Sequence, residues 1–158
     1  PDLHIIPLRG NVDTRLGKLE AGEMDAILLA AAGLRRLGHG ARIDATLPAE
    51  QFVPAVGQGA LALQCREDDA GTRARLQRLE DRAARIATDA ERAFLVRLEG
   101  SCRTPLGAHA TLQGETLHLD GFLAREPGAP LRRAQRTGPT KDAAALGTAL
   151  ADHLLSLA

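Results

Sequence analysis

Residues 108–123 read AHATLQGETLHLDGFL, and this stretch predicts a β-hairpin. Apolar side chains alternate with polar ones on either side of Gly114-Glu115, as in two half-buried strands joined by a turn. A third strand is expected over 131–137, after a Pro-Gly loop signal. The sequence therefore predicts a three-stranded antiparallel sheet.

Helices are expected on both sides of this hairpin along the chain. Residues 82–98 and a final helix opened by Pro139-Thr140 each carry one apolar stripe at helical spacing. The stripes are Ala83, Ile86, Ala87, Ala90, Phe94 and Leu98 in the first helix, and Leu146, Leu150, His153, Leu154 and Leu157 in the last. With a shorter helix over 69–79, this order predicts a small α+β domain over 68–158, with helices on one face of the sheet.

The segment before residue 48 follows another pattern. Residues 4–8 and 26–30 are apolar enough to be strands. Between them Asn11 is a good N-cap for a helix that stops near Gly22, and a further helix is expected over 31–37. This order predicts a βαβ unit with a parallel pair, and a further strand is expected at 60–65.

Composition excludes several classes of function. The 20 basic and 20 acidic residues cancel, which gives no support to binding of nucleic acid or of a membrane surface. Aromatic residues make up only 2% of the chain, so stacking on bases is not expected. The histidines have no metal-ligand spacing, and no metal site is predicted. Two cysteines, Cys65 and Cys102, make no disulfide framework and favour a reducing cytoplasm.

Two features suggest chemistry. Cys102 lies in a loop of small and polar residues, and Arg97 and Arg103 nearby favour its thiolate. An ordinary half-buried thiol is the alternative. Arg9 and Arg15 surround a helix N-terminus, which favours an anion and, through the guanidinium fork, a carboxylate. Solvated surface arginines are the alternative here, as they are for Arg35-Arg36.

Four motifs carry a resemblance to a known family. They are LRGNVDTRL at 8–16, DAILLAAAGLRRL at 25–37, PAVGQGA at 54–60, and AERAF at 90–94 leading into LEGSCRTPLG at 98–107. In this order they closely resemble the porphobilinogen deaminase (hydroxymethylbilane synthase) signature, over essentially the whole chain. The resemblance implies a transferase of haem and tetrapyrrole biosynthesis. That family joins four porphobilinogen molecules into hydroxymethylbilane, with release of ammonia.

The resemblance also implies site residues. The family builds its product on a dipyrromethane cofactor, held by a thioether to a cysteine that matches Cys102. The arginines that grip the acetate and propionate groups of cofactor and substrate match Arg9, Arg15 and Arg36. A glutamine–glycine turn near the hinge between two domains matches Gln58 and Gly59. Arg92 also matches a family arginine, whose role is structural.

The family has two domains like type 2 periplasmic binding proteins and a smaller domain that bears the cysteine. Residues 1–47 would be the C-terminal part of the second, truncated α/β domain. Residues 48–67 would be a hinge and a strand returning to the first domain, and 68–158 the cofactor-attachment domain. The chain is thus expected to be the C-terminal part of a cytoplasmic enzyme.

The family's catalytic aspartate would lie outside this chain, so no catalytic residue is assigned and the fragment alone is expected to be inactive. Expected partners are porphobilinogen, the growing oligopyrrole and the missing N-terminal half, with no nucleic acid and no membrane, and the complete enzyme is expected to be a monomer. The alternatives are a non-catalytic module that binds a small anion, with nothing attached to Cys102, and an interaction or folding unit without a ligand.

Overall fold

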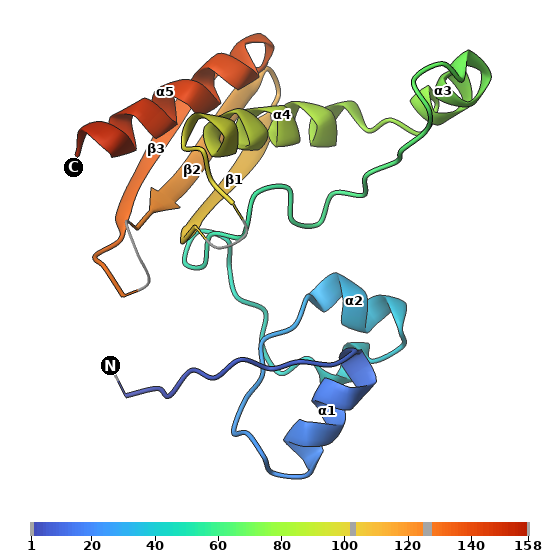
Figure 1. Ribbon diagram of the computed structural model, residues 1–158, viewed down its shortest axis with the longest axis vertical. Helices are drawn as coiled ribbons and strands as arrows, with labels where there is room; N and C mark the ends of the chain where they lie inside the picture. The colour runs from blue at the N-terminus through green and yellow to red at the C-terminus, as the bar shows by residue number, and fades with distance from the viewer. Residues whose placement is uncertain (1, 102–103, 125–127, 158) are drawn as a thin grey trace. The chain divides into compact units, whose positions relative to one another are not determined.

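The computed structural model describes residues 2–101, 104–124 and 128–157 (Figure 1). The chain divides into two compact units, Pro1–Thr46 and Leu47–Ala158. The predicted domain boundaries at residues 47 and 67 stay predictions, although residues 47–67 belong to the same compact unit as the sheet. In the described part of the chain, no helix is long and apolar enough to cross a membrane.

The larger unit is built on the predicted antiparallel sheet. Its strands are β1 (Leu106–Gln113), β2 (Thr116–Leu123) and β3 (Arg132–Pro139), in the order β1-β2-β3. In the hairpin, Ala110 lies opposite Leu119 and Leu112 opposite Leu117, so the apolar side chains of both strands share one face. The predicted hairpin and third strand are confirmed.

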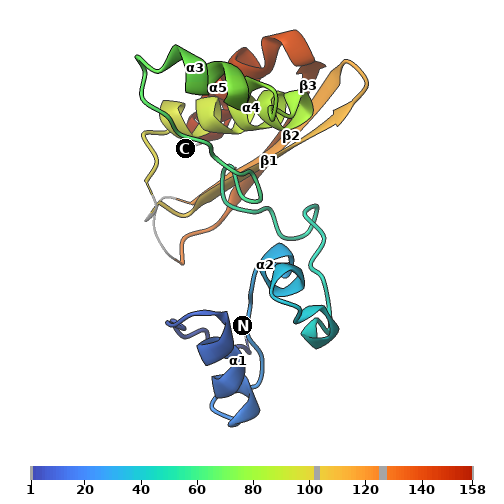
Figure 2. The same cartoon turned by 90° about the vertical axis from the view of Figure 1, so that its right-hand side faces the viewer.

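Two helices cover that apolar face (Figures 1 and 2). They are α4 (Arg82–Arg97) and α5 (Ala143–Ser156), and the short helix η2 (Thr140–Asp142) leads into α5. The core includes Phe94, Leu117, Leu119, Leu150 and Leu154. The small α+β domain with helices on one face is therefore confirmed. Of the predicted stripes, Ala83 and Leu157 are exposed: Ala83 lies in the first turn of α4, and Leu157 is the C-cap of α5.

The helices α1 (Val12–Glu20), α2 (Ala31–Arg36) and η1 (Gly40–Arg42) make up the regular structure of the smaller unit. Leu16 and Leu34 are its buried side chains among the described residues. A further helix, α3 (Ala70–Gln77), precedes α4 in the sequence. Asp69 caps it, because its Oδ1 accepts a hydrogen bond from the Thr72 N–H.

The strands predicted at 4–8, 26–30 and 60–65 are wrong for this structure. None of these segments pairs with another, and the described residues contain no strand besides β1, β2 and β3. A strand needs a neighbour for its backbone N–H and C=O groups. Ile5, Leu28 and Leu61 are 88%, 69% and 79% exposed, so no layer covers these segments. The predicted parallel pair is absent, and the periplasmic-binding-like class of residues 1–47 is not confirmed.

Candidate functional site

The N-terminus of α1 is organised by Asn11 and Arg15. The Asn11 Oδ1 accepts hydrogen bonds from the backbone N–H and the hydroxyl of Thr14, at 2.8 and 2.7 Å, and so caps the helix. The Arg15 Nε donates to the Gly10 carbonyl at 2.8 Å, which holds the guanidinium over the loop before the helix. The terminal nitrogens of Arg15 have no partner within the described ranges.

Arg9 and Arg36, the other two arginines predicted to bind carboxylates, are exposed. Neither makes an ion pair or a side-chain hydrogen bond with another described residue, whereas Arg42 binds Glu20 at 2.5 Å. Arg9 and Arg15 flank the same helix N-terminus, where the helix dipole favours an anion. Arg36 lies in the last turn of α2, and no interaction between described side chains joins it to the other two.

Polar contacts tie α1 to the segment that follows α2. The His39 Nε2 lies 3.0 Å from the Asp13 Oδ1, and the Arg42–Glu20 pair is a second link. Exposed pairs of this kind are individually weak. The three arginines therefore belong to one compact unit that is held by two links and by the burial of Leu16 and Leu34.

The Gln58 turn belongs to the other unit. Gly57 and Gly59 have φ angles of +71° and +87°, which glycine adopts readily. The Gln58 N–H donates to the Ala55 carbonyl at 3.1 Å, and the Ala55 N–H donates to the Gln58 Oε1 at 3.3 Å. Because Oε1 faces this donor, the Nε2 of the exposed Gln58 side chain is the group left for a ligand oxygen.

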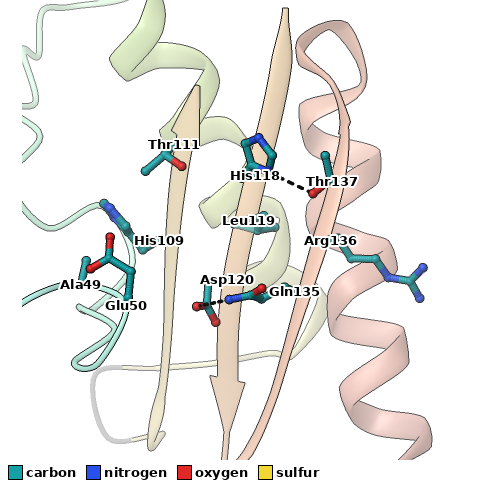
Figure 3. A pocket seen from close by; sticks show the side chains of 10 residues that line it. All are labelled: Ala49, Glu50, His109, Thr111, His118, Leu119, Asp120, Gln135, Arg136 and Thr137. Carbon is teal, nitrogen blue, oxygen red and sulfur yellow. Dashed lines mark hydrogen bonds between the residues drawn. The ribbon is translucent and has the colours of Figure 1, made fainter. Parts of the chain in front are cut away.

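A shallow cavity of about 130 Å³ lies on the face of the sheet opposite the helices (Figure 3). Its polar lining includes Glu50, His109, His118, Asp120 and Gln135. The His118 Nδ1 lies 3.1 Å from the Thr137 hydroxyl, and Gln135 donates to Asp120 at 2.8 Å. None of the site residues predicted from the sequence lines this cavity. Within the described ranges, no three His, Cys, Asp or Glu side chains are grouped so as to hold a metal ion.

Comparison with known families gives two matches that lie in sequence along the chain. The porphobilinogen deaminase dipyrromethane cofactor binding domain matches residues 1–74, and the porphobilinogen deaminase C-terminal domain matches residues 86–156. The chain belongs to the porphobilinogen deaminase family. It therefore has a role in tetrapyrrole biosynthesis, in a family of transferases whose substrate is porphobilinogen.

The porphobilinogen deaminase cofactor is dipyrromethane, and the residues of 1–74 fit it chemically. Its acetate and propionate groups need cationic donors with fork geometry. Arg9, Arg15 and Arg36 are such donors, and the described structure leaves their terminal nitrogens without protein partners. Arg9 and Arg15 were predicted from the capped helix start that they flank, and Arg36 was predicted from the family resemblance.

The predicted attachment residue, Cys102, and its neighbour Arg103 lie outside the described residues. Before them, the Gly100 N–H donates to the Leu95 carbonyl and the Glu99 N–H to the Val96 carbonyl, both at 3.0 Å, which closes α4 with a Schellman motif. After them, Thr104 N–H donates to the Ser101 carbonyl at 3.0 Å. The second cysteine, Cys65, is half-buried.

Sequence reasoning missed one buried residue, Glu91. Its side chain is 6% exposed, and Glu91 is the buried charged residue of the described structure. It lies four residues after Ala87 and three before Phe94, on the apolar side of α4. An acidic residue within an apolar stripe was the signal that could have found it.

Proposed function

We propose that this chain carries dipyrromethane on Cys102 of a porphobilinogen deaminase and binds its carboxylates with Arg9, Arg15 and Arg36. The observation that supports the carboxylate sites is that the terminal nitrogens of these arginines have no partner among the residues that the structure describes. Cations left unpaired on a structured unit are available to a polycarboxylate ligand. When bound, dipyrromethane supplies the pyrrole to which the first substrate is joined.

Each residue has a distinct part in this proposal. The Cys102 sulfur holds the cofactor covalently, and a thiolate is the reactive form for such a bond. Arg15, oriented by its bond to the Gly10 carbonyl, offers both terminal nitrogens to one carboxylate. Gln58 offers its Nε2, and Gly59 allows a close approach of ligand to backbone because it has no side chain.

The arginines can be tested by conservative substitution in the enzyme that contains this chain. Arg15→Lys and Arg36→Lys keep the charge and lose the fork, so we expect porphobilinogen consumption to fall about ten-fold or more. Arg42→Lys is the matched control, since Arg42 already pairs with Glu20. Full activity of both variants would show that these positions do not grip carboxylates.

We also propose that residues 1–158 alone do not convert porphobilinogen, because the resemblance assigns the family's catalytic aspartate to no residue of this chain. The partner in that case is the N-terminal part of the enzyme, in a cytoplasmic monomer. In the same assay, the isolated chain is expected to form no hydroxymethylbilane. Product formation by the isolated chain would contradict this.

A further inference from the structure

Glu91 connects three separate elements through one buried carboxylate. It lies in α4, and its Oε1 accepts the Ala110 N–H of β1 at 2.9 Å. Its Oε2 accepts the Gly57 N–H at 2.7 Å. Each oxygen of the buried carboxylate therefore accepts a hydrogen bond from a backbone N–H. The two donors, Gly57 and Ala110, are 53 residues apart in the sequence.

The positions of the two N–H donors in the fold show what the Glu91 carboxylate joins. β1 is an edge strand, and the Ala110 N–H that binds Glu91 faces away from β2. The Gly57 N–H belongs to the turn that presents Gln58. Glu91 thus covers an open strand edge and joins it to that turn, which satisfies two buried or half-buried polar groups at once.

The chain before the turn lies directly on the sheet as well. A side-chain carbon added at Gly107 of β1 would lie 2.6 Å from the Pro54 carbonyl oxygen, so strand and segment are in close contact. Farther back, Arg133 of β3 donates to the Glu50 carbonyl, and Arg133 is itself held by Asp120. The segment from Glu50 to Gly57 is therefore hydrogen-bonded at both ends, to Arg133 of β3 and to Glu91 of α4.

We propose that Glu91 is a positioning residue that holds the Gln58-Gly59 turn against the domain that bears Cys102. The proposal rests on the function proposed above for Gln58 and Gly59. Arg133 makes the second contact, with the carbonyl of Glu50, which lies eight residues before Gln58 in the sequence. Together they fix where the turn presents the Gln58 amide, without contacting a ligand themselves.

The positioning role of Glu91 can be tested by amide hydrogen exchange, with residues 1–158 carrying Glu91→Gln compared with the unsubstituted chain. Glutamine offers one oxygen and one NH₂ group, so one of the two N–H donors would face another donor. Because a charge-assisted bond is lost, we expect exchange at Gly57 to accelerate about ten-fold to a hundred-fold, with α5 unchanged. Asp89→Asn removes a charge from the same helix, where the described side chain makes no hydrogen bond, and should leave Gly57 unchanged. Unchanged exchange at Gly57, or equal acceleration throughout α4, α5 and the sheet, would overturn the proposal.

The rate of porphobilinogen consumption distinguishes the positioning role of Glu91 from the function proposed for the Gln58-Gly59 turn. In the enzyme that contains this chain, Glu91→Gln and Gln58→Ala should both slow porphobilinogen consumption, while the intact mass shows the cofactor still attached. If Gln58→Ala slows turnover and Glu91→Gln does not, Glu91 is not a positioning residue. If Gln58→Ala has no effect, the function proposed for the turn fails, whatever exchange at Gly57 shows.

Discussion

At the scale of single residues, Asp120 is the clearest case of competing electrostatic effects. Burial raises the pKa of this carboxyl, but hydrogen bonds from Arg133 and Gln135 and the charges of Arg133 and His109 outweigh it. The Asp120 pKa therefore lies below its ordinary value in the folded chain. Asp120 in turn forms an ion pair with Arg133, whose guanidinium nitrogen lies 2.5 Å from the carboxylate oxygen. The same guanidinium donates a hydrogen bond to the Glu50 carbonyl.

A pH dependence follows for Asp120→Asn. Because the folded pKa is depressed, the ionised group stabilises the fold above its unfolded pKa of about 3.9, and this is lost as pH falls through the folded pKa. We expect the variant to be less stable by about 1.5 kcal/mol at neutral pH, the lower end for charge-assisted bonds, since Arg133 is partly exposed.

Urea unfolding of both proteins between about pH 7 and about pH 3 checks this expectation. The difference between wild type and variant should be constant down to about pH 5 and shrink below about pH 4. A difference that stays constant or grows in acid would show that the Asp120 charge is not what stabilises the fold.

The candidate site was predictable in part at this scale. Arg9 and Arg15 could be found because a capping residue and a glycine mark the helix start between them. Glu91 stands out in its own segment as an acidic residue within an apolar stripe, but its partners could not be found there, because Gly57 and Ala110 are distant in sequence and lie beside it only in the folded chain. Gln58 could be placed in a turn, but its amide orientation needed the position of the Ala55 N–H.

At the scale of elements, the contact between α4 and α5 depends on Gly147. A side-chain carbon at this position would lie 2.1 Å from the Ala90 carbonyl oxygen and 3.0 Å from the Phe94 nitrogen. Both are backbone atoms, so the helices would have to move apart to accept it. Gly147 is therefore what allows α5 to lie directly on α4 above the sheet.

Gly147→Ala should accordingly destabilise the larger unit by about 3 kcal/mol or more, because overpacking here cannot be relieved by a side-chain rotation. Gly17→Ala is the control. Gly17 lies within α1 with no atom within 4 Å of the added carbon, and alanine there should stabilise the helix by about 0.5–1 kcal/mol. Circular dichroism during urea unfolding measures both; wild-type stability of Gly147→Ala would refute the close contact.

Elements whose signals are local were predicted correctly, and the isolated strands expected at 4–8, 26–30 and 60–65 were not. The hairpin, α4 and α5 each carry their own period, turn or cap, and the structure has all three. Residues 26–30 have the apolar run of a buried strand, but a strand exists only with a neighbour, and the described residues supply none. Apolar composition alone therefore overpredicted the sheet in the first 65 residues.

At the scale of the whole molecule, the two family matches and the two compact units divide the chain differently. The cofactor binding domain matches residues 1–74, which include all of the smaller unit and the Gln58 turn of the larger one. The C-terminal domain matches residues 86–156, and this part contains Cys102. On our proposal, attachment and carboxylate binding are thus supplied by different units of one chain.

Attachment of dipyrromethane to Cys102 is the central claim, and intact mass with peptide mapping of the purified enzyme tests it most directly. We expect a two-pyrrole adduct on the peptide that contains Cys102, its loss in Cys102→Ser, because a serine hydroxyl ionises far less readily than a thiol, and its retention in Cys65→Ser. An adduct that persists in Cys102→Ser, or a wild-type enzyme that is active with an unmodified Cys102, would contradict the account.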